Sequence, residues 1–388
     1  MNIAIIGLGY VGLPLALCAN TDKYNITAID VSFDKIQNLK AGILPIKDSV
    51  LEQKIKGSGV KFTKSLEEGL KDADIAFICV PTDWDEKKKT LNTEIVEGVI
   101  ADGIKINNSV TFVIKSTISY KCTKKLCSKL NYDKILFSPE FLREGHAGED
   151  TMNPSRIIVG SDLADDTCAR AVINYLLDLI EGDEKRKQCQ TIITSTQEAE
   201  SVKLFANTYL ATRVAFFNEL STFALKEDLD VENIIKGICL DWRIGDYYNQ
   251  PSFGFGGYCL PKDSLQCSEL FFSDESAIIK NIAKANDLRK DFIVGYVISK
   301  GYNIIGIDRL VMKPDSDNFR ESASVDIATR LANTGKKVII FEPMLTTNPW
   351  KDWNNITIIN DYELFSQCCE VVLSDAKVKR LKENGNEI

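Results

Sequence analysis

Asn2-Ile3-Ala4-Ile5-Ile6-Gly7-Leu8-Gly9-Tyr10-Val11-Gly12 is the stretch that decides the fold class. Its apolar run predicts a buried strand, and glycines spaced GxGxxG fall where that strand passes into a helix. In that position Gly7 permits a tight turn, Gly9 lets a pyrophosphate approach the backbone, and Gly12 allows the helix to pack closely on the strand. The start of the helix supplies amides for the phosphates. The stretch therefore predicts a dinucleotide-binding loop.

A second apolar run, Asn25–Ile29, ends directly before Asp30. A carboxylate at the end of the second strand can accept hydrogen bonds from the ribose hydroxyls of a dinucleotide, and it repels a 2′-phosphate. Asp30 therefore favours NAD over NADP. GxGxxG alone is also compatible with a purely structural turn, but the strand, the helix and Asp30 together favour the cofactor.

Further apolar runs continue the pattern through the N-terminal half of the chain. The candidate strands are Asn2–Ile6, Asn25–Ile29, Ile75–Val80, Val110–Lys115, Ile135–Phe137 and Ile157–Val159. Because the runs are apolar on both faces and helical patterns separate them, they predict a parallel sheet of βαβ units. Such a sheet presents its ligand crevice at the carboxyl ends of the strands, where Thr82 and Thr117 stand.

A long helix is predicted next, because Gln197–Lys236 contains neither Gly nor Pro and its apolar residues recur at helical spacing. Ser195 and Glu198 form a capping-box pattern at its start. We expect a break near Asp228–Asp230, and we expect the helix to join two domains and to pack against a second copy of itself. A third region repeats the strand–helix–strand pattern, with candidate strands Asn303–Ile307 and Val338–Phe341.

Composition excludes several classes of protein. The 388 residues fit two or three domains, and a net charge of −8 argues against a general nucleic-acid binder. No uninterrupted apolar segment is long enough to predict a membrane span. The odd number of cysteines, 11, is typical of reduced thiols in a cytosol. His146 is the only histidine, so His-rich metal sites are excluded and the chemistry is expected to use Cys, Lys, Asp, Glu and Asn.

Phe253-Gly254-Phe255-Gly256-Gly257-Tyr258-Cys259-Leu260-Pro261-Lys262-Asp263 carries the sharpest catalytic signal. Its glycines allow a ligand to approach the backbone, and a charged, Gly-rich loop is a poor place to bury an apolar thiol. A neighbouring cation favours the thiolate, so Cys259 is predicted to be a nucleophile. Other thiols are interpreted as inert core residues, among them Cys18, Cys79 and Cys239.

Two further sets of polar residues are candidates for the same site. Lys203 and Asn207 stand four residues apart on the long helix, so both can donate to an oxyanion, although their spacing alone favours the alternative of a solvated helix face. The segment Ser138–Gly145, with two carboxylates and an arginine, follows another strand end. It suggests acid–base work and phosphate binding, with an isolated surface turn as the alternative.

Taken in order, these segments resemble the UDP-glucose/GDP-mannose dehydrogenase family over nearly the whole chain. The matching segments are GLGYVG at Gly7–Gly12, KST at Lys115–Thr117, SPEFLREG at Ser138–Gly145, NPSRIIVG at Asn153–Gly160, the Lys203/Asn207 helix, PSFGFGGYCLPKD at Pro251–Asp263 and DSDNFRES at Asp315–Ser322.

The resemblance implies a four-electron oxidation of a sugar CH2OH to a carboxylate, with two NAD consumed per sugar. Cys259 would hold the sugar carbon first as a thiohemiacetal and then as a thioester. By position in the family motifs, Lys203 and Asn207 would stabilise oxyanions and Glu140 would act as general base. Thr117 and Asp263 would hold the water that releases the product.

The resemblance also implies two sets of contacts. NAD would be contacted by Val11, Asp30, Lys35, Thr82, Thr117, Glu144 and Lys262. The nucleotide sugar would be contacted by Phe141, Leu142, Arg143, Glu144, Lys203, Asn207, Tyr248, Asn249, Gln250, Pro251, Ser252, Gly256 and Arg320. Arg243 would reach it from a neighbouring subunit, which would make a homodimer the functional form.

The fold class expected from these arguments is α/β, with two Rossmann-like doubly wound domains joined by a long central helix. We expect an NAD-binding domain over residues 1–195, a central helical dimerisation region with the cysteine loop over 196–300, and a UDP-sugar-binding domain over 301–388. The segment Tyr258–Asp263 and the loop before it look closest to those of family members that act on UDP-glucose, which implies UDP-glucose as substrate and UDP-glucuronate as product.

Three alternatives stay open at this point. One is another nucleotide sugar, either GDP-mannose or a UDP-N-acetylhexosamine. A second is a two-electron hydroxyacid dehydrogenase, a class that also pairs a GxGxxG domain with a helix carrying Lys and Asn four apart but that needs no loop cysteine. A third is a catalytically silent dinucleotide-binding protein, which would bind NAD without turnover.

Overall fold

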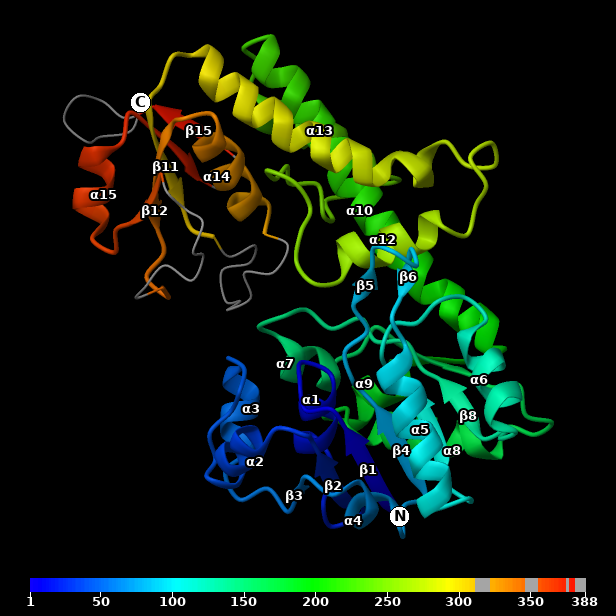
Figure 1. Cartoon of the computed structure of the whole chain (residues 1–388). Coiled ribbons are helices and arrows are strands. Elements are labelled where there is room, and N and C mark those ends of the chain that lie inside the picture. The colour runs from blue at the N-terminus through cyan, green and yellow to red at the C-terminus, as the bar shows by residue number, and fades with distance from the viewer. Residues whose placement is uncertain (311–321, 346–354, 375–376, 381–388) are drawn as a thin grey trace. The chain divides into compact units, whose positions relative to one another are not determined.

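The structure, a computed structural model, describes residues 1–310, 322–345, 355–374 and 377–380, the last of these as backbone only. The chain divides into two compact units, Met1–Phe205 and Ala206–Ile388 (Figure 1). The division falls inside the long helix α10 (Thr196–Lys226).

The first unit is built on an eight-stranded sheet in the order β10-β9-β8-β7-β4-β1-β2-β3. The strands are β1 (Asn2–Ile6), β2 (Asn25–Ile29), β3 (Lys61–Thr63), β4 (Ile75–Ile78), β7 (Thr111–Ile114), β8 (Ile135–Phe137), β9 (Arg156–Gly160) and β10 (Gln190–Thr194). The chain starts in the middle of the sheet and builds toward β3 before crossing to β4, so a topological switch point lies between β1 and β4. A doubly wound sheet binds its ligand at that point.

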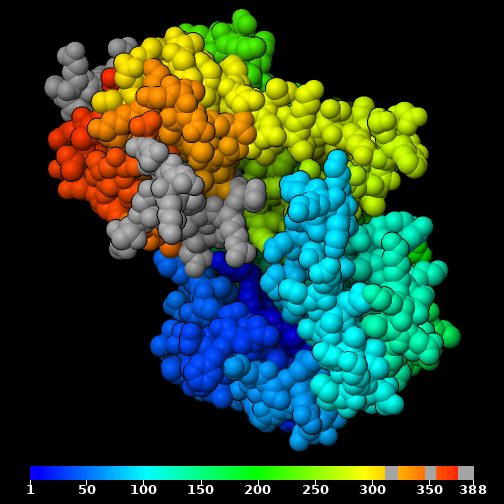
Figure 2. Space-filling view, viewed as in Figure 1, coloured from blue at the N-terminus to red at the C-terminus, as the bar shows by residue number. Residues whose placement is uncertain are grey.

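Helices cover both faces of this sheet, as the two-sided apolar runs predict. Alternate residues of β1 show why: Ile3 and Ile5 join one buried cluster, whereas Ala4 and Ile6 join another. The first cluster includes residues of α1 (Gly12–Leu17), α2 (Phe33–Lys40), α3 (Ser49–Lys54) and α8 (Thr167–Asp178), and the second includes residues of α4 (Leu66–Leu70), α5 (Glu94–Ile106) and α6 (Cys122–Leu130). Two short helices, α7 (Ala147–Met152) and α9 (Asp183–Gln188), complete the unit. A hairpin of β5 (Trp84–Asp85) and β6 (Thr90–Leu91), in light blue, stands out from its body (Figure 2).

One expectation about the sheet is corrected. In this sheet β1, β2, β3, β4, β7 and β8 are parallel, but β9, the predicted strand Ile157–Val159, pairs with β8 in the antiparallel direction. The segment between them, residues 138–155, carries only the short helix α7 instead of a long crossover helix, so the chain reverses direction between β8 and β9. The strands β3 and β10 were not predicted, because the three residues of β3 include a single apolar one and β10 is largely polar and exposed.

The predicted long helix and its break are confirmed. Helix α10 ends at Lys226, and α11 (Val231–Cys239) begins after Asp230, whose carboxylate accepts hydrogen bonds from the amides of Glu232 and Asn233. At its start, the Ser195 amide donates to Glu198 at 3.0 Å and the Glu198 amide donates to the Ser195 hydroxyl at 3.3 Å, which is the predicted capping box.

The rest of the second unit combines helices with a second sheet. The described residues form a sheet in the order β13-β12-β11-β14-β15, parallel except for β15. Its elements, with the helices before it, are α12 (Leu260–Ser268), α13 (Ile278–Ser299), β11 (Ile304–Asp308), α14 (Ala323–Asn333), β12 (Lys337–Phe341), β13 (Ile356–Ile358), α15 (Tyr362–Cys368), β14 (Val371–Ser374) and β15 (Lys377–Arg380). Residues of α13 and α14 cover one face and Phe365 of α15 packs on the other, as expected of a second doubly wound domain.

Candidate active site

The Gly7–Gly12 turn has the geometry that a pyrophosphate loop requires. Gly7 has φ +92°, and a Cβ on it would lie 2.6 Å from the Cys79 carbonyl oxygen. A Cβ on Gly12 would lie 1.9 Å from the Gly7 carbonyl oxygen, so the third glycine is needed for packing. A Cβ on Gly9 would have no atom of the described residues within 4 Å, which leaves this side of the loop open to a ligand. These features fit a dinucleotide.

Asp30 lies at the end of β2 and is held from three sides. Its carboxylate accepts hydrogen bonds from the Leu8 amide at 3.0 Å, the Ser32 amide at 3.0 Å and the Lys35 ammonium at 2.7 Å. Burial acts to raise the pKa of Asp30, but the hydrogen bonds from Lys35 and the two amides outweigh it and hold that pKa below its ordinary value. Because a carboxylate has about four acceptor positions, roughly one remains for a ribose hydroxyl.

Two predicted threonines line the carboxyl edge of the same sheet. Thr82 is 2% exposed and Thr117 is 8% exposed, and they follow the neighbouring strands β4 and β7. The Ser116 hydroxyl donates to the Val80 carbonyl at 2.6 Å and so ties the two strand ends together. The predicted cofactor contacts Thr82 and Thr117 therefore stand next to the switch point.

Glu140 and Lys203 are brought together although 63 positions separate them. The Lys203 ammonium donates to the backbone carbonyl of Glu140 at 2.6 Å. The Glu140 carboxylate forms an ion pair with Lys115 at 2.9 Å. Lys203 is 6% exposed, so its predicted alternative, a solvated helix face, does not hold for this residue.

The segment after Glu140 is braced from within. The Arg143 amide donates to Asp150 at 2.7 Å, and the Arg143 guanidinium pairs with the same carboxylate at 2.6 Å. The charge of Arg143 is thus already paired with Asp150. The side chain of Arg143 therefore stabilises this loop, and a phosphate would compete with Asp150 for it. Phe141, partly buried, lies beneath the guanidinium of Arg156 at 3.9 Å, and the predicted contacts Leu142 and Glu144 are partly exposed beside it.

In the second unit, Asn207 and Asp263 form a buried pair. The Asn207 amide donates to Asp263 Oδ2 at 2.5 Å, and Asp263 is fully buried. Asp263 Oδ1 lies 3.4 Å from the Lys262 ammonium but has no hydrogen-bond partner among the residues that the structure describes. A buried acceptor without a hydrogen bond favours the binding of a donor, such as a water molecule or a substrate hydroxyl.

Cys259 occupies the N-cap position of α12 and is partly exposed. A helix N-terminus stabilises an anion, so a thiolate is favoured there. The interior thiols differ, because desolvation raises the pKa of Cys18 to about 12 and that of Cys79 to about 12. Of these three cysteines, Cys259 alone combines access with an environment that favours the reactive form.

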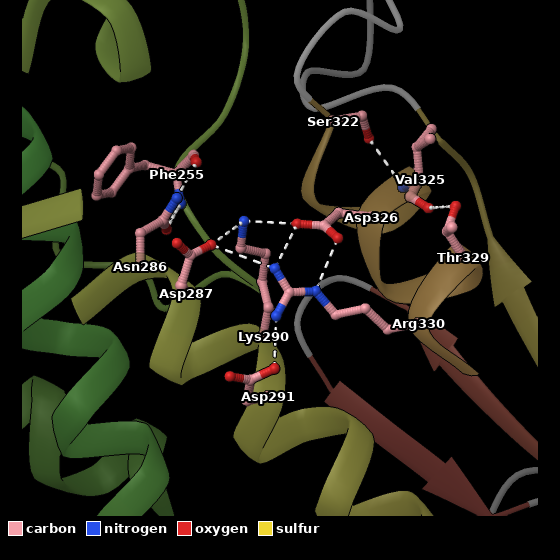
Figure 3. A network of polar contacts seen from close by, with 10 residues as sticks. All are labelled: Phe255, Asn286, Asp287, Lys290, Asp291, Ser322, Val325, Asp326, Thr329 and Arg330. Carbon is pink, nitrogen blue, oxygen red and sulfur yellow. Dashed lines mark hydrogen bonds and ion pairs between the residues drawn. The ribbon is translucent and has the colours of Figure 1, made fainter. Parts of the chain in front are cut away.

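The loop before Cys259 is fixed to α13. The side-chain amide of Asn286 accepts from the Phe255 backbone N–H at 2.8 Å and donates to its carbonyl at 2.8 Å, so it pairs with both backbone groups (Figure 3). A Cβ on Gly254 would lie 2.9 Å from the Asn286 oxygen, which explains a glycine there. Arg330 of α14 joins this helix through Asp291 at 2.5 Å and Asp287 at 3.2 Å (Figure 3).

The predicted substrate loop Tyr248–Ser252 shows one difference from expectation. Asn249 is 2% exposed, and its amide is used inside the protein, where its oxygen accepts from Arg213 at 2.7 Å and its nitrogen donates to Gly245 at 2.6 Å. Its side chain is therefore a brace, and a substrate contact at this position would have to use its backbone. Ser252 is held by the buried Arg289, which donates to its carbonyl at 3.1 Å.

The remaining predicted contacts are dispersed. Gln250 and Pro251 line a cavity of about 660 Å³ between the end of α10 and α11. Arg243 is exposed, and its guanidinium forms an ion pair at 2.5 Å with Asp241, two residues earlier in the same segment. Tyr248 has φ +57° and is half exposed, and Gly256 is partly buried. Arg320 lies outside the described residues.

Sequence reasoning gave no role to three residues that organise the site. Lys115 lies in the quoted Lys-Ser-Thr segment. The only sequence feature that could have indicated its role is its position at the end of a predicted strand. Asn286 and Arg289 lie in a helix whose pattern carries no sign of their contacts. Within the part of the chain that the structure describes, no cluster of three or more His, Cys, Asp or Glu could hold a metal ion, and no helix is long and apolar enough to cross a membrane.

Comparison with known proteins accounts for nearly the whole chain. The NAD binding domain, central domain and UDP binding domain of the UDP-glucose/GDP-mannose dehydrogenase family match residues 1–176, 197–288 and 306–384. UDP-glucose 6-dehydrogenase of Campylobacter jejuni is 40% identical over 99% of this chain and 97% of its own length. That of Streptococcus pneumoniae is 40% identical over 94% and 93%. A UDP-glucose dehydrogenase structure from Pyrobaculum islandicum, 26% identical, superimposes with a TM-score of 0.84 over 96% of this chain and 88% of that one. The chain therefore belongs to the UDP-glucose/GDP-mannose dehydrogenase family.

Proposed function

We propose that this chain is an NAD-dependent UDP-glucose 6-dehydrogenase, which oxidises UDP-glucose to UDP-glucuronate. The observation that carries the proposal is Cys259, a partly exposed thiol at the start of α12, the helix that also carries Asp263 of the buried Asn207–Asp263 pair. The 40% identity to two UDP-glucose 6-dehydrogenases over nearly the full length supports the same substrate.

The cofactor would be held by the first unit. The loop Gly7–Gly12, with Val11 at the helix start, would receive the pyrophosphate, and Asp30 with Lys35 would face the adenosine ribose. Thr82, Thr117 and Glu144 from the first unit and Lys262 from the second complete the proposed contacts. When bound, NAD supplies the hydride acceptor for both oxidation steps.

The proposed role of Cys259 is to bond to the oxidised sugar carbon. Its sulfur adds to the C6 aldehyde to form a thiohemiacetal, which becomes a thioester when the second hydride leaves. Water then attacks the thioester carbonyl, the carbon–sulfur bond breaks, and the carboxylate departs with the thiol restored. A two-electron hydroxyacid dehydrogenase needs no such thiol, so the position of Cys259 argues against that alternative.

Two donors and one base would serve these steps. Lys203 and Asn207 stand one helical turn apart on α10, so an ammonium and an amide can both donate to the oxygen on which negative charge develops. Glu140, held beside Lys203, is the proposed base that accepts the hydroxyl proton. Asp263 Oδ1, buried without a hydrogen bond among the described residues, is suited to hold the hydrolytic water together with Thr117.

The sugar nucleotide would be bound by the loops around these groups. The proposed contacts are Phe141, Leu142, Arg143, Glu144, Lys203, Asn207, Tyr248, Asn249 through its backbone, Gln250, Pro251, Ser252, Gly256 and Arg320. The match of residues 306–384 to the family's UDP binding domain supports a C-terminal domain that holds the nucleotide. We accordingly propose a three-part division at 1–195, 196–300 and 301–388.

A homodimer is part of the proposal. Tyr209, Phe216 and Phe223 follow one another at seven-residue intervals on α10 and are 60%, 60% and 53% exposed. This spacing places them on one helix face, and such an apolar face is typical of a helix that packs against another copy. Arg243 would then reach the site of the neighbouring subunit. Eleven free thiols favour a reducing, cytoplasmic location.

The test is turnover by the purified protein with NAD and each of UDP-glucose, GDP-mannose and a UDP-N-acetylhexosamine. We expect the highest kcat/KM with UDP-glucose and UDP-glucuronate as the product. A higher kcat/KM with one of the other sugars would transfer the proposal to that substrate. NAD binding without turnover of any of them would support the silent binding protein instead.

A further inference from the structure

The strands β7 and β8 place a buried lysine against the proposed base. They pair in parallel with Ile114 opposite Phe137, and the Ser138 amide donates to the Ile114 carbonyl at 2.9 Å. Lys115 and Ser138 are the next residues of the two strands, so the register itself brings the lysine to the segment that carries Glu140. Lys115 has a side chain 2% exposed.

The Lys115 ammonium has a contact for each of its three N–H groups. It lies 2.9 Å from Glu140 Oε2, 3.3 Å from the Ser138 hydroxyl and 3.4 Å from the Pro139 carbonyl. The other carboxylate oxygen of Glu140 accepts from the Phe141 amide at 3.0 Å. Both oxygens of the carboxylate are thereby oriented, one by the lysine and one by the backbone.

A small cavity lies behind this pair. It measures about 30 Å³ and is lined by Lys115, Ser138, Glu140, Thr151 and Arg156 among others. One water needs roughly 10–15 Å³ and two or more polar partners. The Thr151 hydroxyl is buried and has no hydrogen-bond partner among the residues described, so it offers one of them, and Glu140 offers another.

We infer that Lys115 is a positioning residue for Glu140, and that one internal water joins Thr151 to the same carboxylate. The inference rests on the proposed function of Glu140 as the base. Lys115 keeps the carboxylate pointed, since it holds one carboxylate oxygen at 2.9 Å while the Phe141 amide holds the other at 3.0 Å. The other groups near Glu140 are the ammonium of Lys203, the guanidinium of Arg156 lining the cavity, and the Cys79 thiol.

The test is a double-mutant cycle in the full chain with Lys115→Met, Glu140→Gln and both together. Lys115→Met is expected to lower kcat on the order of 10²-fold, the contribution of a general base, with KM for UDP-glucose within about twofold of wild type. Lys115→Arg, which keeps the charge, should recover part of the loss.

The double variant keeps the inference testable if Lys115→Met folds poorly, because it leaves no buried charge unpaired. If Lys115 acts through Glu140, the double variant has the kcat of Glu140→Gln alone. Losses that multiply in the double variant, or a Lys115→Arg variant that recovers none of the loss, would overturn the inference, while wild-type turnover leaves the proposed function standing. Absence of wild-type turnover would count against the proposed function itself.

The water has its own test in crystals of the wild type and of Thr151→Val. A density peak within about 3 Å of the Thr151 hydroxyl and of the Glu140 carboxylate is expected in the wild type and not in the variant. A cavity without a peak in the wild type would overturn this part of the inference.

Discussion

Replacing Asp30 by serine is expected to weaken NAD binding and to admit NADP. The carboxylate has roughly one acceptor position left for a ribose hydroxyl, since Leu8, Ser32 and Lys35 use the others. A hydrogen bond to a charged group contributes about 1.5–3 kcal/mol, so the KM for NAD should rise about 10- to 150-fold. Serine keeps an oxygen that can still accept from the Leu8 amide, which protects the loop.

The same change alters the charge beside the 2′ position. In the wild type, Asp30 pairs with Lys35 and adds a negative charge that repels a 2′-phosphate. At about 4 Å and an effective dielectric constant near 20, that repulsion is on the order of 4 kcal/mol before screening. Once the carboxylate is gone, the Lys35 ammonium is released to attract the phosphate. We expect the ratio of kcat/KM for NADP to that for NAD to rise at least about 10²-fold.

Steady-state assays with both cofactors measure this effect. Asp34→Ser, an exposed position on α2, removes the same net charge and should leave both values near wild type. Adding Lys35→Met to Asp30→Ser should abolish the gain with NADP. An unchanged KM for NAD in Asp30→Ser would refute the assignment of the ribose contact, and a gain that survives Lys35→Met would refute the role of the lysine.

Three further outcomes are expected. Cys259→Ala should abolish UDP-glucuronate formation while NAD binding, followed by fluorescence titration, persists; full product formation would remove Cys259 from the mechanism. Asn286→Leu, which loses both hydrogen bonds to Phe255, should slow alkylation of Cys259 by iodoacetamide or change its pH dependence, whereas unchanged alkylation would show that the clamp does not position the loop. Glu198 has a pKa held to about 2 by hydrogen bonds from Thr194 and Ser195, so its stabilising contribution is present above its ordinary value near 4.5 and is lost as the pH falls toward 2. The difference in melting temperature between wild type and Glu198→Gln should therefore shrink between about pH 6 and about pH 3, and a constant difference would contradict the capping role.

The parts of the fold that sequence predicts well are those whose signals are contiguous. The strand Asn2–Ile6, the glycine turn and the helix behind it follow each other without interruption, so local preferences agree with the final structure. The break after α10 is similar, because Asp230 is a strong N-cap residue placed where the apolar periodicity stops. The strands β9 and β10, at one end of the sheet, are different: their direction depends on how the segment after β8 returns, which no local pattern records.

The same distinction explains the candidate site. Cys259 and Asp263 could be proposed because they lie in one short segment of sequence with a strong composition signal. The Lys115–Glu140 pair depends on the register of two strands, and the clamp of Asn286 on Phe255 joins residues 31 positions apart. The burial of Asn249 could not be predicted either, because its hydrogen bonds to Arg213 and Gly245 depend on how this loop packs against α10.

One thiol, that of Cys259, is proposed to carry the sugar carbon through two successive oxidations. The most direct measurement is the amount of NADH formed when a limiting, known quantity of UDP-glucose is consumed completely by the wild-type protein. Two NADH for each UDP-glucose are predicted, with UDP-glucuronate as the only product. One NADH for each sugar, with an aldehyde or ketone as the product, would contradict this role of the thiol.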